Sequence, residues 1–102
     1  MTPGYLEGKA VLVSGDGGAA HRAVVVALAQ AGANVAVGGA AADLPAEAAL
    51  HSIANEIWAL GRRSVVVPIE NGAAGEVAAM AQASEELGRI DLILRCNPVL
   101  QA

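Results

Sequence analysis

Short apolar runs alternate with helical patterns along the whole sequence. The apolar runs have the length of buried strands, and each stretch between them repeats its apolar residues at helical spacing. In chain order we expect strands at Ala10–Ser14, Asn34–Gly38, Ser64–Ile69 and Ile90–Leu94, with helices at Ala19–Ala31, Asp43–Gly61 and Gly75–Leu87 between them. This β-α-β-α-β-α-β order predicts an α/β fold of three layers, with a four-stranded parallel sheet and right-handed crossovers. For a doubly wound sheet the expected strand order is 3-2-1-4.

Local signals place the helix ends and the faces expected to be buried. Gly32 follows the first helix as a left-handed stop, and Asp43 is a suitable N-cap for the second. The inward residues are expected to be Val24, Leu28 and Ala31 in the first helix, Leu50, Ile53, Ile57 and Leu60 in the second, and Val77, Met80, Ser84 and Leu87 in the third. The opposite face of the second helix then leaves Trp58 near solvent, either as a partner contact or lying flat on its neighbours.

Composition limits the class of protein. The 102 residues suffice for one domain, 1–102, and 55% of them are hydrophobic without a single Phe. The net charge of −4 and only six dispersed Lys and Arg argue against nucleic acid or an anionic membrane as a partner. The single cysteine, Cys96, allows no internal disulfide and no zinc motif. The first residues contain no secretory signal, so we expect a cytoplasmic protein.

Four stretches of this sequence resemble the first half of the short-chain dehydrogenases/reductases, especially their ketoacyl-reductase-like members. They read LEGKAVLVSG, LAQAGANVAV, ANEIWALGRRSVVVP and EELGRIDLIL, and together they cover nearly the whole chain. The resemblance implies a Rossmann-like fold, truncated after its fourth strand, and NAD or NADP as cofactor. The catalytic Ser, Tyr and Lys of the family lie beyond that strand, outside this sequence.

The cofactor motifs of the family are altered in this sequence. Where the family reads TGxxxGxG, Ser14 and Gly15 match, but Ala19 and His21 replace the second and third glycines. The other ligand-facing positions are Gly38-Gly39-Ala40 in place of an Asp or Arg, Glu70-Asn71 in place of Asp-Val, and Arg95-Cys96-Asn97-Pro98 in place of Asn-Asn-Ala-Gly. We therefore expect a vestigial cofactor site at Ser14, Gly15, Asp16, Gly17, Glu70 and Asn71, with no cofactor bound. In an alternative register, Gly15, Gly17 and Ala20 fit the general G-x-G-x-x-G/A fingerprint, and the helix N-terminus would still hold an anion.

Several polar residues are expected to gather at the carboxyl ends of the strands, where open α/β sheets bind ligands. They are Asp16, His21, Glu70, Asn71, Arg95, Cys96 and Asn97. As catalytic candidates, His21 would be a base and Cys96 a nucleophile within its reach, with Arg95 beside them. The simpler interpretation has His21 facing solvent or capping the turn, Cys96 inert, and Arg95 paired with Glu70.

An apolar fourth strand at the edge of the sheet favours association. We therefore expect a homodimer or a hetero-partner, joined through Ile90–Leu94 and Gly75–Leu87. Three functions follow. The first is a non-catalytic half-domain that acts by assembly. The second is an NAD(P)-binding oxidoreductase component completed by another chain. The third is a small enzyme with new chemistry at the strand ends. Stabilisation by nicotinamide cofactors distinguishes the second from the first.

Overall fold

The computed structural model describes residues 5–41, 43–70 and 73–96. In chain order its elements are β1 (Ala10–Gly15), α1 (Ala19–Gln30), β2 (Asn34–Gly39), α2 (Leu44–Ala59), β3 (Ser64–Pro68), α3 (Ala73–Leu87) and β4 (Leu92–Cys96). The four strands are all parallel and lie in the order β3-β2-β1-β4. This confirms the predicted α/β fold and its strand order.

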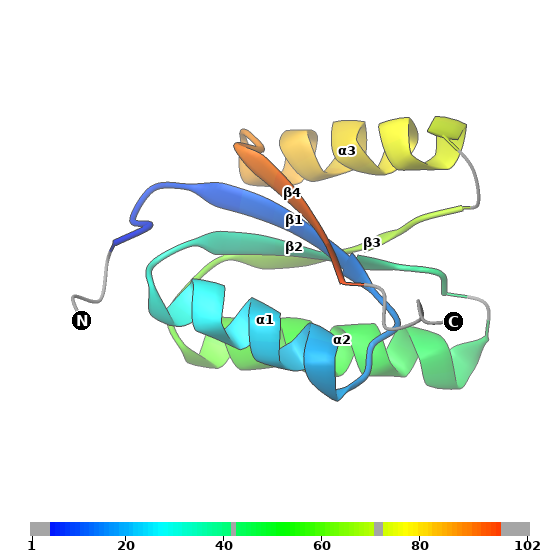
Figure 1. The fold of residues 1–102 in the computed structure, drawn as a ribbon, viewed down its shortest axis with the longest axis horizontal. Helices are drawn as coiled ribbons and strands as arrows, with labels where there is room; N and C mark the ends of the chain where they lie inside the picture. The colour runs from blue at the N-terminus through cyan, green and yellow to red at the C-terminus, as the bar shows by residue number, and fades with distance from the viewer. Residues whose placement is uncertain (1–4, 42, 71–72, 97–102) are drawn as a thin grey trace.

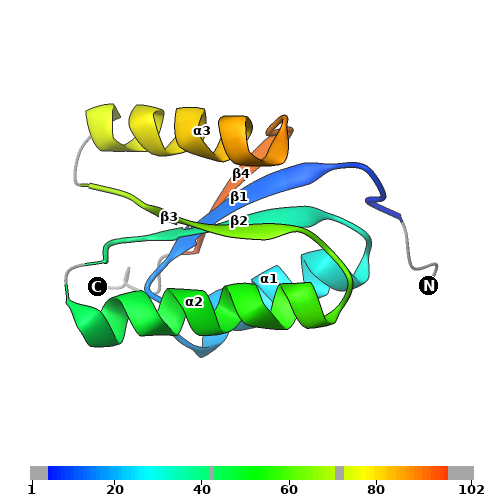
Figure 2. The same ribbon diagram turned by 180° about the vertical axis from the view of Figure 1, so that it is seen from behind.

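The helices form two layers around the sheet. Helices α1 and α2 lie on one face, and α3 lies alone on the other (Figure 1). The view from behind shows the same division (Figure 2). Since α1 follows β1 on one face and α3 precedes β4 on the other, the carboxyl ends of β1 and β4 flank the point where the chain direction switches, which is the usual ligand site of such sheets.

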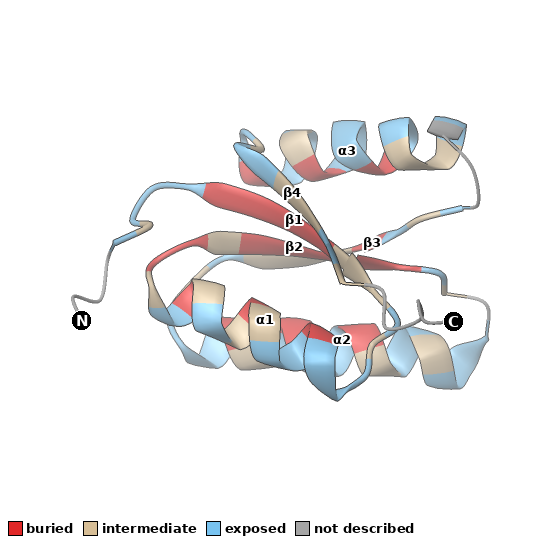
Figure 3. Ribbon diagram, viewed as in Figure 1, coloured by how far each residue is buried: buried red, intermediate tan, exposed pale blue. Residues whose placement is uncertain are grey.

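The two central strands form the core of the molecule. β1 and β2 are buried along most of their length, whereas β4 is mostly half-buried or exposed (Figure 3). On the α1–α2 side, β1 and β2 pack against helix residues such as Val25, Leu50 and Ile57, and on the α3 side against Ala79, Ala83 and Leu87. Short side chains on α3 let that helix approach the sheet closely.

Three expected helix faces differ from the observed ones. In α1 the fully buried residues are His21, Val25 and Ala29, one position away from the predicted stripe, while Val24 and Leu28 are half-buried. In α3, Val77 and Met80 are exposed, and alanines occupy the inner positions. Leu60 of α2 is also exposed. In α3 the close approach of the helix to the sheet selects alanines where we expected the largest apolar side chains, whereas Leu60 is exposed because it lies at the C-cap of α2.

The boundaries of the last two elements also differ. α3 begins at Ala73 instead of Gly75, and β4 runs two residues later than the predicted Ile90–Leu94. Asp91 explains the later start of β4, because its carboxylate accepts the Ala10 N–H at 2.9 Å while its own N–H donates to the Ala10 carbonyl at 2.8 Å. The Ala10 N–H is therefore bound by the Asp91 side chain and not by the backbone of a strand. β4 begins at the next residue, Leu92, and includes Arg95 and Cys96.

Candidate functional site

The turn from β1 into α1 lies at the carboxyl edge of the sheet. Gly15 ends β1 beside Cys96, and Gly18 is the N-cap of α1 without a side-chain cap. Gly17 has a φ of +81°, a conformation that favours glycine. Gly39 is required for a different reason: a Cβ there would lie 2.6 Å from the Gly15 carbonyl oxygen. The glycines therefore bring the ends of β1 and β2 together with bare backbone.

His21 is fully buried beneath this turn. Its Nε2 lies 3.0 Å from the carbonyl oxygen of Val13, and its Nδ1 accepts the Gly17 N–H at 3.0 Å. Because a carbonyl only accepts, Nε2 carries the proton and Nδ1 does not, so the ring is neutral. The ring fills the space next to Gly15, where an added Cβ would lie 2.5 Å from it. The expectation of a solvent-facing His21 was wrong, whereas the alternative, a His21 that caps the turn, is confirmed by the Gly17 N–H bond. Both ring nitrogens are occupied by backbone.

Asp16 folds back onto the same turn. Its Oδ1 accepts the Gly18 N–H at 2.8 Å, which places a carboxylate at the N-terminus of α1. A helix N-terminus attracts negative charge, so this carboxylate lies where a phosphate would be favoured. Asp16 is exposed and this is the single hydrogen bond of its side chain among the described residues. The N–H groups of Gly17 and Gly18 are thus bound by the side chains of His21 and Asp16.

The basic side chains are engaged elsewhere. Arg22, in the first turn of α1, forms a bidentate pair with Glu56 of α2. Arg95 donates from Nε and Nη2 to the Glu76 carboxylate of α3 at 2.8 and 2.7 Å. This pairing lowers the pKa of Glu76, chiefly through the hydrogen bonds from Arg95. The expected Glu70–Arg95 pair is therefore wrong: Arg95 lies within β4 and reaches the helix above it.

The remaining predicted site residues are placed as follows. Ser14 and Gly15 lie side by side with Arg95 and Cys96 across the β1–β4 pair. Cys96 is a half-buried free thiol at the end of the strand. With both nitrogens of His21 bonded to backbone, His21 does not serve Cys96 as a base. Asn71 and Asn97 lie outside the described residues.

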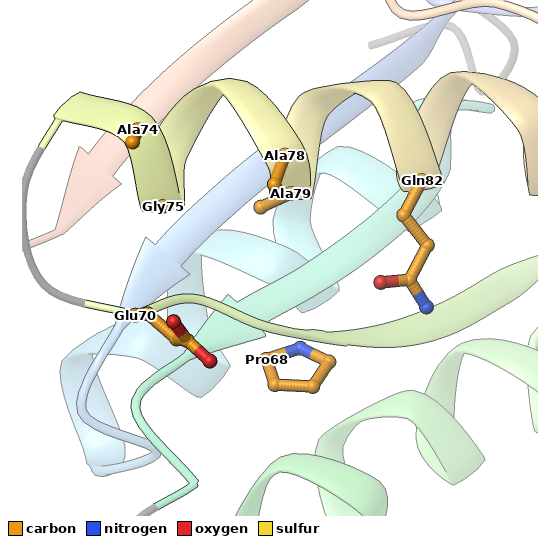
Figure 4. Close-up of a pocket in the computed structure, with 7 residues that line it drawn as sticks. All are labelled: Pro68, Glu70, Ala74, Gly75, Ala78, Ala79 and Gln82. Carbon is orange, nitrogen blue, oxygen red and sulfur yellow. The ribbon is translucent and has the colours of Figure 1, made fainter.

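Glu70 lines a separate hollow between the end of β3 and α3. This groove has a volume of about 390 Å³, and Figure 4 shows its walls, which are Pro68, Glu70, Ala74, Gly75, Ala78, Ala79 and Gln82. Gly75 comes so close to β3 that an added Cβ would lie 2.0 Å from the Glu70 carbonyl oxygen. Sequence reasoning missed this groove because small residues in a helix carry no signal of a hollow. The described residues hold no cluster of three or more metal-binding side chains.

Comparisons with known proteins agree with this geometry. No protein-family model matches the chain. A curated relative, the L-rhamnose 1-dehydrogenase (NAD(P)(+)) of Sphingomonas sp. strain SKA58, is 38% identical over 96 residues, covering 87% of this chain and 34% of the relative. A short-chain type dehydrogenase/reductase from Mycobacterium marinum has a TM-score of 0.74 at 29% identity, with 86% of this chain and 34% of that chain covered.

The chain is similar to the first part of a short-chain dehydrogenase/reductase. It spans about a third of the length of these relatives. A third similar protein is the carveol dehydrogenase of Mycobacterium avium, solved in complex with NAD, with a TM-score of 0.76 at 26% identity over 88% of this chain and 35% of that chain. The short-chain dehydrogenase/reductase resemblance is thus confirmed, and the relatives include NAD(P)-dependent dehydrogenases. The described helices include none that is long and apolar enough to cross a membrane.

Proposed function

We propose that this chain is the nucleotide-binding component of an NAD(P)-dependent oxidoreductase. The observation that carries the proposal is the glycine turn between β1 and α1, at the switch point of a 3-2-1-4 sheet. Relatives with this fold include a dehydrogenase that uses NAD(P) and one solved with NAD. This favours the second of the three functions over the assembly role that we expected first.

The backbone of the turn fits a dinucleotide. Gly17 and Gly39 keep side chains away from the turn, and Gly18 leaves the N-terminus of α1 without a side-chain cap. The pyrophosphate would lie against Gly15–Gly18 and the first turn of α1, replacing the Asp16 carboxylate on the Gly18 N–H. Since Asp16 is exposed, its side chain can turn into solvent. The cofactor would supply hydride transfer, and this chain would bind and orient it.

The proton-donating residues of such a reaction would come from elsewhere. The only tyrosine and the only lysine of the sequence are Tyr5 and Lys9, and both precede β1. Residues outside this sequence, on the same or on another polypeptide, would complete the active site. The residues at the end of β2, Gly38 to Ala40, offer no positive charge to a 2′-phosphate, so we expect NAD to bind more tightly than NADP.

Calorimetric titration with NAD⁺, NADH and NADP⁺ tests the proposal. We expect the wild type to bind NAD⁺ or NADH, and Asp16→Asn to bind about tenfold more tightly, since it removes a competing carboxylate. Asp43→Asn is the matched control, because Asp43 also occupies a helix N-terminus, that of α2, away from the turn. If neither the wild type nor Asp16→Asn binds any nicotinamide nucleotide, the proposal is wrong.

A second candidate function is the non-catalytic one, in which the chain acts by assembly alone. Asp16 and His21 favour it, because they already satisfy the Gly17 and Gly18 N–H groups, and no arginine is free at the turn among the described residues. Under this function no nucleotide raises the melting temperature, and His21 and Asp16 serve only to hold the turn. The same titration therefore separates the two candidates.

A further inference from the structure

Helix α2 carries an exposed stripe on the side that is turned away from the sheet and from α1. Leu50 and Ile57 face the core, and Glu56 faces α1, with which it forms an ion pair. The outer stripe lies on the remaining side of the helix, and all its members are exposed: Leu44, Ala48, His51, Asn55 and Trp58. Leu44 is 79% exposed and Trp58 is 61% exposed. Two large apolar side chains of one helix therefore lie uncovered along the same line.

The spacing of the outer stripe is that of a coiled-coil seam. Its members are separated by four, three, four and three residues, the repeat of helices that pack on each other at about +20°. In such a seam each large side chain enters a hole between four residues of the facing helix. The large side chain of this stripe is Trp58. A hole of the right kind surrounds the small Ala48, and its other corners are Leu44, Glu47 and His51, at positions i, i+3 and i+7 to the i+4 of Ala48.

We propose that α2 pairs antiparallel with α2 of a second copy of this chain, with Trp58 of each copy in the hole around Ala48 of the other. The methyl group of Ala48 leaves room for the indole, and Leu44 gives it an apolar neighbour. The indole N–H is a donor that usually has a partner when the ring is covered. At the corner of the hole the Glu47 carboxylate is an acceptor for it. The two halves of the stripe are therefore complementary in shape, in polarity and in charge.

The polar residues of α2 favour the antiparallel orientation. With Trp58 over Ala48, His51 lies opposite Asn55 of the other copy, so an imidazole meets an amide with which it can form a hydrogen bond. The Glu47 carboxylates of the two copies lie about 18 Å apart along the helices, and the helix dipoles oppose each other. A parallel pair would bring both Glu47 side chains to the same level and align the dipoles.

The outer stripe lies at the end of the molecule away from β4. α2 packs on β2 and β3 (Figure 2), whereas a doubly wound sheet of order 3-2-1-4 continues beyond β4. A polypeptide that extends the sheet therefore does not cover the stripe. The glycine turn lies on the other flank of α2, where a Cβ added to Gly17 would be 2.9 Å from the Cβ of Ala49. The pairing is thus independent of nucleotide binding and does not rest on the proposed function.

The fluorescence of Trp58 reports on the pairing, because Trp58 is the only tryptophan of the sequence. Even interfaces of about 1,600 Å² range down to micromolar affinity, so for one helix from each copy we expect a dissociation constant above about 1 μM. As the protein concentration rises to about 1 mM, light scattering should show a change from monomer to dimer. The Trp58 emission maximum should move to shorter wavelength over the same range. A protein that stays monomeric, or a dimer that forms without this shift, refutes the proposal.

The substitution Ala48→Glu tests the hole itself. The longer side chain fills the space for the indole in both copies, so the dissociation constant should rise about 30-fold. Ala81→Glu is the matched control, because Ala81 is an exposed alanine of α3, and it should leave the dissociation constant unchanged. A dimer that is equally sensitive to both substitutions, or to neither, places the contact elsewhere and overturns the proposal. Circular dichroism checks that both variants fold.

Disulfide formation tests the orientation and the register. Two variants, His51→Cys and Asn55→Cys, are each made in a Cys96→Ser background, mixed in equal amounts and oxidised mildly. Residue 51 lies opposite residue 55 of the other copy, whereas identical residues are displaced by about 6 Å along the helices. The mixed disulfide, identified by its mass, should therefore exceed the random proportion. A random distribution, or an excess of disulfides between identical variants as a parallel pair would give, overturns the register.

Discussion

The replacement of His21 by alanine gives a quantitative test of the turn. The substitution leaves the Val13 carbonyl and the Gly17 N–H without their partners, at about 1–1.5 kcal/mol each. Removal of a fully buried ring adds about 1–2 kcal/mol for the cavity. We therefore expect the free energy of unfolding to fall by about 3–5 kcal/mol, a large part of the 5–15 kcal/mol typical of a domain.

Equilibrium urea denaturation measures this loss, and a thermal melt should show a decrease of about 15–25 °C. His51→Ala is a matched control, because His51 is the only other histidine and its side chain is 58% exposed on α2. That substitution should change the free energy of unfolding by less than about 0.5 kcal/mol. A loss below about 1 kcal/mol for His21→Ala would refute the buried, doubly bonded ring.

A double-mutant cycle with Gly15→Ala isolates the contact between the ring and the turn. In the wild type the new Cβ would lie 2.5 Å from the His21 ring, so Gly15→Ala should destabilise the protein by about 1–3 kcal/mol. In the His21→Ala background the space is vacant, and the same change should have almost no effect. Additive losses would show that the ring does not occupy the space beside Gly15.

Three further predictions concern the rest of the fold. The pKa of Asp91 is lowered, first by the Arg89 guanidinium and then by a backbone N–H of β1, so its stabilising effect is complete above about pH 3.9 and disappears as the pH falls through the lower folded value. The difference in urea midpoint between the wild type and Asp91→Asn should therefore narrow on acidification, and a constant difference would contradict this. Asp43→Ala removes the N-cap of α2 and should lower the free energy of unfolding by about 1 kcal/mol, measured in the same way. Gly75→Ala brings a methyl group against the Glu70 carbonyl and should cost about 1–3 kcal/mol, whereas an unchanged melting temperature would mean that α3 does not approach β3 so closely.

Much of the fold follows from the sequence, because the spacing of apolar residues and the residues that begin or end a helix are local properties of the chain. The alternation of strand and helix patterns predicted all seven elements, and Gly32 and Asp43 marked helix ends that the structure confirms. The right-handed crossover of parallel strands and the usual 3-2-1-4 order of doubly wound sheets were enough to predict the strand order. The start of β4 was predicted two residues too early, because it depends on the bonds between Asp91 and Ala10, a partner distant in sequence.

The candidate site, too, was predicted from the sequence only in part. The sequence placed Gly15, Gly17 and His21 in the turn, and it showed that the motif of the family is altered there. It gave no means of deciding the direction of the His21 ring, since that depends on the space left beside Gly15 by the packing of α1 on β1. The sequence also did not predict the ion-pair partner of Arg95, because Glu76 reaches it only when α3 packs on the sheet.

The sequence by itself determined the class of fold, the order of its strands and the position of the glycine turn, because each follows from residue type and spacing along the chain. Only the tertiary structure decided that His21 is buried with both ring nitrogens bonded to backbone, that Asp16 occupies the N-terminus of α1, and that Arg95 pairs with Glu76. Those features depend on distances between segments far apart in sequence, which are fixed only when the helices pack on the sheet.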